Sequence, residues 1–260
     1  MMDMRQRIVR ELSRIEQEEQ VRILYACESG SRAWGFPSQN SDYDVRFIYV
    51  RKKEDYLSLF EKRDVIERPI SDMLDISGWD LKKALRLYRK SNPPLLEWLQ
   101  SPIVYKEKPG VIDELRKQSA HSFSQRACMY HYLHMARGNY REYLQGDKVR
   151  IKKYFYVLRP ILACQWIEEA QTTPPIKFSA LVERLVVKDT ELYRDINSLL
   201  ARKKAGEELD IEPSRPVINH FIEEKLAYYE ALASRIPAST DNHDALLDRW
   251  FLATINGNTG

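Results

Sequence analysis

The stretch that decides the fold is GSRAWGFPSQNSDYD, residues 30–44. A short apolar run, residues 21–27, precedes it, and a second one, residues 45–50, follows it. Both runs have the length and the residue types of β-strands, whereas glycine, proline, serine and asparagine between them are typical of a turn. We therefore predict two strands joined by a glycine-containing connection.

Two carboxylates stand at the start of the second predicted strand. Because side chains alternate across a strand, Asp42, Asp44 and Arg46 share one face, and the apolar residues between them share the other. Carboxylates this close repel each other unless a cation lies between them, and hard oxygen ligands suit Mg²⁺. The pattern predicts a metal site with Asp42 and Asp44 as ligands.

Gly30 and Ser31 supply a second chemical feature. Glycine lets the backbone approach a ligand closely, and a turn from a strand into a helix directs free N–H groups and the Ser31 hydroxyl toward an anion. A phosphate-binding turn facing metal-binding carboxylates is typical of nucleotidyl transfer, in which cations hold the attacking and leaving oxygens in line around phosphorus.

A site of this kind needs a third carboxylate on a neighbouring strand. We predict further strands at residues 64–67 and 71–76, and Asp75 lies in the second of them between two apolar residues. Asp72 is the alternative. Asp75 could instead end its strand and cap the following helix.

These motifs resemble the signature of the DNA polymerase β type nucleotidyltransferase superfamily, in which Gly-Ser is followed by Asp-x-Asp ahead of an apolar strand. The string from Glu28 to Phe47, with DISGWDL at residues 75–81, resembles one branch of predicted bacterial and phage nucleotidyltransferases associated with RNA repair. The resemblance is firm over residues 20–105 and extends to the remainder of the chain.

The resemblance implies roles for the motif residues. Asp42 and Asp44 would bridge two Mg²⁺ ions, and Asp75 would bind one of them and help to deprotonate the incoming hydroxyl group. Gly30 and Ser31 would hold the β and γ phosphates of a nucleoside triphosphate (NTP).

A predicted helix over residues 147–169 carries a basic and aromatic face. Lys148, Lys152, Tyr156 and Arg159 lie at helical spacing, and Pro160 is expected to kink or interrupt the helix. Nucleotidyltransferases commonly place such a helix of a second domain opposite the Asp-x-Asp strand. The resemblance therefore implies nucleotide binding by Lys152, Tyr156 and Arg159, although an exposed helix face would show the same spacing.

A second basic stripe follows the proposed third carboxylate. On the predicted helix 79–90, Lys82, Arg86, Arg89 and Lys90 fall on one side. They could steer a triphosphate or a polyanionic acceptor, and an ordinary solvated helix face would have the same composition.

Composition indicates a globular, cytoplasmic protein. The 260 residues are 43% hydrophobic and 30% charged, and the formal net charge is +3. No apolar run approaches the roughly 20 residues that cross a bilayer, and the charged N-terminal helix lacks the apolar stretch of a signal peptide. We expect no membrane partner, and so mild a positive charge leaves a nucleic-acid acceptor open.

Strand-like runs cease after Pro109, which places a domain boundary near residue 108. We predict an α+β fold: a small mixed β-sheet nucleotidyltransferase domain, similar to the polymerase β palm, at residues 1–108. An all-helical domain at residues 109–260 follows and closes the nucleotide cleft.

The function predicted is Mg²⁺-dependent transfer of a nucleoside monophosphate from an NTP to an acceptor hydroxyl, with release of pyrophosphate. The acceptor could be an RNA end, a protein or a small molecule. One alternative is a nucleotide-binding regulator or partner-binding module on the same fold without turnover. Another is a metal-dependent phosphatase or nuclease, for which the sequence lacks an evident His-Asp cluster.

Overall fold

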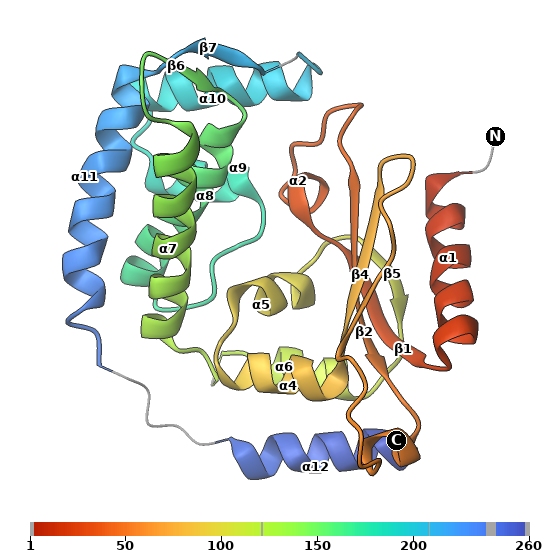
Figure 1. The fold of residues 1–260 in the computed structure, drawn as a ribbon. Helices are drawn as coiled ribbons and strands as arrows, with labels where there is room; N and C mark the ends of the chain where they lie inside the picture. Colours follow the sequence, from red (N-terminus) through yellow and green to blue (C-terminus); the bar gives the residue numbers. More distant parts are fainter. Residues whose placement is uncertain (1–2, 121, 208, 238–242, 258–260) are drawn as a thin grey trace. The chain divides into compact units, whose positions relative to one another are not determined.

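The structure, a computed structural model, describes residues 3–120, 122–207, 209–237 and 243–257 (Figure 1). The chain forms two compact units. The sheet unit comprises the described parts of residues 1–33, 42–122 and 241–260, and the helical unit those of residues 34–41 and 123–240. These bounds differ from a single division after residue 108, because the sheet unit continues to residue 122, residues 34–41 belong to the helical unit, and the last helix belongs to the sheet unit.

Within the described residues, five strands form one mixed sheet in the order β3-β4-β2-β1-β5. Their bounds are β1 Arg22–Glu28, β2 Tyr43–Val50, β3 Val65–Glu67, β4 Leu74–Asp80 and β5 Val104–Glu107. Strands β2 and β4 run parallel, and the other neighbours are antiparallel. The four predicted strands are found, but the one predicted at residues 71–76 begins only at Leu74, after a turn, and continues to Asp80. Strand β5 was not predicted because its run is short and half polar.

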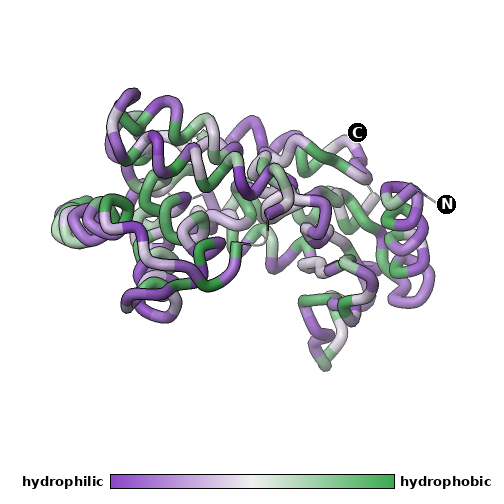
Figure 2. The backbone as a smooth tube through the Cα atoms, turned by 90° about the horizontal axis from the view of Figure 1, so that it is seen from above, coloured by the Kyte–Doolittle hydropathy of each residue, from purple (hydrophilic) through white to green (hydrophobic). Residues whose placement is uncertain are grey.

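Helix α1 (Met4–Glu19) covers one face of this sheet. Ile8, Leu12 and Ile15, on its apolar side, belong to the same buried cluster as Val45 and Phe47 of β2. Figure 2 shows the matching alternation of hydrophobic and hydrophilic residues along this helix. The apolar face predicted for β2 is therefore core, which leaves its charged residues on the other face.

Further helices pack around the rest of the sheet unit: α2 Gly30–Ala33, α3 Lys53–Tyr56, α4 Leu81–Arg89, α5 Pro93–Leu99, α6 Val111–Gln118 and α12 Asp244–Ile255. Helix α4 contacts β2 and β4, and α12 contacts α4 and α6 (Figure 1). Asn92 caps α5 by accepting a hydrogen bond from the Leu95 backbone N–H, with Pro93 in the first turn.

The helical unit contains α7 Gln125–Tyr143, α8 Lys153–Ala170, α9 Phe178–Leu185, α10 Glu191–Lys204 and α11 Pro216–Ala233. It is not all-helical, because β6 (Lys148–Arg150) and β7 (Ile211–Pro213) pair antiparallel. The prediction of a helix from residue 147 was wrong at its start, since Lys148 lies in β6. The helix also continues past Pro160, which does not interrupt it.

The segment of residues 34–41, which follows α2, packs within the helical unit. Phe36 stacks on Phe155 of α8 with ring centroids 4.9 Å apart, and the Trp34 carbonyl accepts a hydrogen bond of 3.0 Å from the Phe178 N–H of α9. Burial of these aromatic side chains stabilises the attachment of this segment.

Gly78 of β4 gives a test of the sheet packing. A methyl group there would lie 2.2 Å from Cε2 of the Phe47 ring, so we expect Gly78→Ala to lower the free energy of unfolding by about 1–3 kcal/mol. Gly138 of α7 has no atom within 4 Å of the same position, so Gly138→Ala should raise stability by up to about 1 kcal/mol. Urea unfolding of both variants measures the two effects, and a neutral Gly78→Ala would contradict the packing.

Candidate active site

Asp44 and Asp75 lie side by side near the N-terminal ends of two inner strands of the sheet. They are partners in the register of the parallel strands β2 and β4, and both side chains are about a quarter exposed. The register is extended by a backbone hydrogen bond of 2.7 Å from Tyr43 N–H to the Met73 carbonyl. Strand pairing therefore brings together two of the three predicted carboxylates, which are 31 positions apart in the chain.

Arg46 lies between these two carboxylates. Its Nη2 donates to Asp75 Oδ2 at 2.7 Å and to Asp44 Oδ1 at 3.4 Å, and its Nη1 donates to the Asp75 carbonyl at 3.2 Å. The sequence placed Arg46 on the same face but gave it no role. In this structure its guanidinium supplies the positive charge that adjacent carboxylates require.

The Gly30 turn packs directly against Asp44. Gly30 has φ +58°, and a methyl group on its Cα would lie 2.0 Å from Asp44 Oδ2. The Ser29 N–H also donates to the Asp44 carbonyl at 2.8 Å. Only glycine allows this approach without displacing the carboxylate, so the predicted turn and the predicted carboxylate strand are in contact.

Glu28 is a buried carboxylate beneath the site, and the sequence did not single it out. Its side chain accepts hydrogen bonds from the Asp44 N–H at 2.8 Å and from the Tyr105 hydroxyl. Burial raises the pKa of Glu28, partly offset by these hydrogen bonds. A glutamate at the end of an apolar strand, two residues before Gly30, was the signal that could have identified it.

Burial also raises the pKa of Asp44, although the charge of Arg46 acts in the opposite direction. The charges of Asp75 and Asp42 add to the rise. A divalent cation near Asp44 would favour its ionised form in the way Arg46 does.

The other acidic candidates lie differently. Asp42 is exposed and precedes β2, and its carbonyl accepts a hydrogen bond of 3.1 Å from Arg32 Nε. Asp72 lies in the turn before β4 with φ +46° and forms an ion pair of 3.0 Å with Arg7 of α1. The structure thus brings Asp75, not Asp72, next to Asp44, and the catalytic role of Asp75 stays a prediction.

The donor atoms suit Mg²⁺ in their chemistry, because carboxylate oxygens are its preferred ligands. As the side chains lie, however, no group of three or more His, Cys, Asp or Glu residues among those described could hold a metal ion. The Arg46 guanidinium stands between Asp44 and Asp75, where a cation is favoured.

The nucleotide-binding residues predicted from the second domain lie in the helical unit. Lys152 is exposed just before α8. Tyr156 is also exposed, with its ring edge-on to Trp34 at 5.7 Å. Arg159 is only 2% exposed, with its guanidinium 4.6 Å from the Trp34 ring. Their role in nucleotide binding stays a prediction, and the packing of Arg159 on Trp34 gives it a structural role besides.

Comparison with known proteins identifies the class. The RNA repair pathway DNA polymerase beta family matches residues 4–253. The uncharacterized protein YcgL of Bacillus subtilis (strain 168) is 56% identical over 252 residues, which are 97% of this chain and 96% of that protein. The chain therefore belongs to the RNA repair pathway DNA polymerase β family, and the resemblance to polymerase β type nucleotidyltransferases is confirmed.

A solved structure, a nucleotidyltransferase-like protein from Exiguobacterium sibiricum, matches with 11% identity and a TM-score of 0.31, covering 95% of this chain and 89% of the other. The predicted α+β class, a mixed sheet followed by helices, is seen directly in the strand order and the element order. Among the described helices, none has the length and apolar character needed to span a bilayer.

The contact between Gly30 and Asp44 can be tested with a pair of glycines. Gly30→Ala should destabilise the protein by about 1–3 kcal/mol, because both the positive φ and the carboxylate oppose a methyl group. Gly35 also has a positive φ of +86°, but its nearest neighbour would be 3.9 Å away. Gly35→Ala in urea unfolding therefore measures the backbone strain alone, and equal losses would argue against close packing of the turn on Asp44.

The buried Glu28 predicts a pH dependence of stability. Because its pKa is raised in the folded state, the protonated form favours folding, and this contribution is lost as the pH rises from about 4.3 through the raised pKa. Glu28→Gln should remove that loss and make stability less dependent on pH. Urea midpoints measured from pH 4 to 8 test this, with the exposed Glu183→Gln as control; parallel pH profiles for wild type and Glu28→Gln would contradict it.

Proposed function

We propose that this chain is a Mg²⁺-dependent nucleotidyltransferase that transfers a nucleoside monophosphate from an NTP to an acceptor hydroxyl and releases pyrophosphate. One observation carries the proposal: Asp44 and Asp75 are aligned on neighbouring parallel strands, with the Gly30 turn packed against Asp44. Family membership supports it, because polymerase β type nucleotidyltransferases share this combination of motifs.

In this proposal Asp42 and Asp44 would hold two Mg²⁺ ions, and Asp75 would hold one. When bound, such ions neutralise phosphate charge and align the attacking and leaving oxygens. Asp75 would accept the proton of the acceptor hydroxyl. Gly30 and Ser31 would bind the β and γ phosphates through the turn.

Residues of the helical unit would complete the nucleotide site. Lys152 would contact the triphosphate, with Arg159 as a second positive charge, and the exposed Tyr156 ring offers an aromatic face near which a base could stack. Arg46 would keep the two carboxylates apart and oriented before the ligands arrive.

The acceptor that the family description favours is an RNA end, since that description refers to an RNA repair pathway. A protein hydroxyl or a small molecule would fit the same chemistry, because each presents an oxygen nucleophile to the α-phosphorus.

A nucleotide-binding regulator without turnover is the second candidate, and one observation favours it. Arg46 already neutralises Asp44 and Asp75, as in a site that binds ligands without needing metal-assisted attack. The two candidates differ in whether pyrophosphate is released when NTP and Mg²⁺ are supplied.

The carboxylates provide the decisive test. Transfer of α-phosphate label from each of the four NTPs to RNA, protein and small-molecule acceptors should fall at least about 100-fold in Asp42→Asn, Asp44→Asn and Asp75→Asn, because each loses charge that stabilises the transition state. Asp72→Asn is the matched control: it keeps the positive-φ turn and should retain transfer.

Undiminished transfer in Asp44→Asn would refute the proposal. If wild type binds NTP with Mg²⁺ but no acceptor is labelled and no pyrophosphate is released, the regulator is the better description. Loss of transfer in Asp72→Asn with retention in Asp75→Asn would exchange the roles of these two residues.

A further inference from the structure

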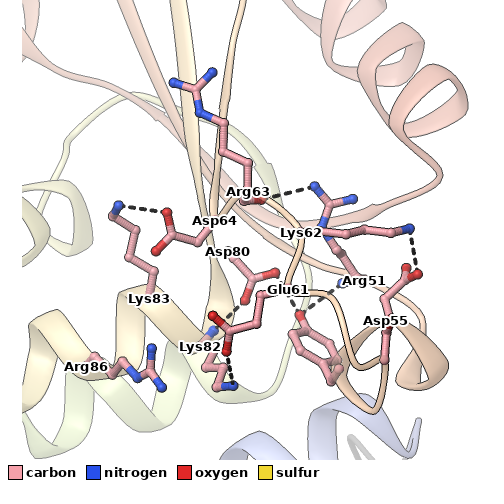
Figure 3. A pocket seen from close by; sticks show the side chains of 12 residues that line it. Arg51, Asp55, Glu61, Lys62, Arg63, Asp64, Asp80, Lys82, Lys83 and Arg86 are labelled. Atoms are coloured by element: carbon pink, nitrogen blue, oxygen red, sulfur yellow. Dashed lines mark hydrogen bonds and ion pairs between the residues drawn. The ribbon is translucent and has the colours of Figure 1, made fainter.

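A pocket lies in the sheet unit, at the opposite end of β2 and β4 from the carboxylates. Here Arg51 follows β2, Asp80 ends β4, and with the loop of residues 57–64 they enclose a pocket of about 360 Å³ (Figure 3). Five residues of strand separate Asp75 from Asp80, which is about 17 Å. A ligand in this pocket is therefore separate from one at Asp44.

Positive charge dominates this pocket. Six basic residues line it: Arg51, Lys62, Arg63, Lys82, Lys83 and Arg86. Of the four acidic residues that also line it, Asp80 is buried, accepts hydrogen bonds from the Tyr56 hydroxyl and the Lys82 N–H, and has a pKa raised by burial. The excess of positive charge favours an anionic ligand.

The remaining acids form surface ion pairs that a polyanion can replace. Lys62 pairs with Asp55 at 2.6 Å, and Lys83 pairs with Asp64 at 3.0 Å. Lys82 approaches Glu61 only to 3.8 Å. Each pair has at least one exposed side chain, and ion pairs at the surface contribute little free energy, so exchange of a carboxylate for a phosphate costs little.

Arg86 is the clearest unused cation. Its side chain is exposed and forms no hydrogen bond or ion pair with another residue in the described part of the chain. With Lys82 it also lines an adjoining pocket of about 280 Å³, which continues along α4 to Arg89 and Phe251 of α12. Three residues of the basic stripe predicted on this helix, Lys82, Arg86 and Arg89, thus line one or both of two pockets that share Lys82 and Arg86.

Exposed apolar side chains belong to the same loop that supplies residues to the pocket. Leu57, Leu59 and Phe60 are 75%, 88% and 80% exposed, in the loop of residues 57–64 that borders the first pocket. Sites for single-stranded nucleic acid combine a basic groove, which follows the phosphates, with aromatic rings on which bases stack. The loop carries the aromatic ring and α4 carries the cations, and the two are linked where Glu61, next to Phe60, lies 3.8 Å from Lys82 Nζ.

We propose that the pocket between the loop of residues 57–64 and α4 binds single-stranded nucleic acid. Lys82 and Arg86 contact its phosphates, and a base stacks on Phe60. A stacked single strand would cover the 17 Å between Asp80 and Asp75 with about five nucleotides. The pocket can therefore hold the middle of a strand while the end of that strand lies outside the pocket. Binding here does not depend on whether the chain transfers nucleotides.

Fluorescence anisotropy with a labelled mixed-sequence 12-nucleotide RNA, and with the DNA of the same sequence, tests the proposal on the full chain. Loss of two phosphate contacts in Lys82→Ala, Arg86→Ala should weaken binding about 25-fold at 0.1 M salt and lower the slope of log affinity against log salt by about 1.4. Phe60→Ala should weaken binding about fivefold or more and leave the salt slope unchanged.

The matched control is Arg10→Ala, Lys188→Ala. It also removes one arginine and one lysine charge, but from exposed positions on α1 and after α9. It should change affinity less than twofold, and circular dichroism should show that all variants are folded. Losses in both site variants no larger than the control's would overturn the proposal. So would competition by free pyrophosphate or a mononucleotide as effective as that of the oligonucleotide, because the pocket would then be a small-phosphate site.

Discussion

The structure of the site depends on the parallel register between β2 and β4. Pairing of these strands sets Asp44 opposite Asp75, and the repulsion between their charges is relieved by the guanidinium of Arg46. A slip of one residue would turn Asp44 toward the α1 face and expose the apolar residues that pack there. The buried cluster with α1 therefore fixes the position of the carboxylates as firmly as any contact within the site.

Glu28, at the end of the neighbouring strand β1, supports the position of Asp44. Glu28 receives hydrogen bonds from the Asp44 backbone and the Tyr105 hydroxyl, so it joins β1, β2 and β5 beneath the carboxylates. Gly30, at the start of α2, packs against the Asp44 carboxylate. Burying a carboxylate costs free energy unless its oxygens accept hydrogen bonds. The Glu28 oxygens accept such bonds, and the one from the Asp44 N–H holds the backbone that carries the Asp44 side chain.

The local patterns in the sequence predicted strands β1 to β4, the Gly30 turn and the positions of the carboxylates, because each is encoded within a few neighbouring residues. What they could not predict depends on pairing between distant segments. Arg46 was visible on the correct face, but its contact with Asp75 follows from the β2–β4 register. Likewise Lys148 fits a helical spacing, yet it lies in β6 because Ile211–Pro213 pairs with it. The burial of Arg159 depends on Trp34, more than a hundred residues earlier.

Helix α12 belongs to the sheet unit, although it follows most of the helical unit in the chain. Its Phe251 packs edge-on against Tyr56, and the Thr254 carbonyl accepts a hydrogen bond from Arg22. The helical unit is thus an insertion within the sheet unit along the chain. During synthesis the strands of the sheet emerge before residues 123–240 of the helical unit, and α12 emerges after them, so the helical unit can fold before the sheet unit is complete.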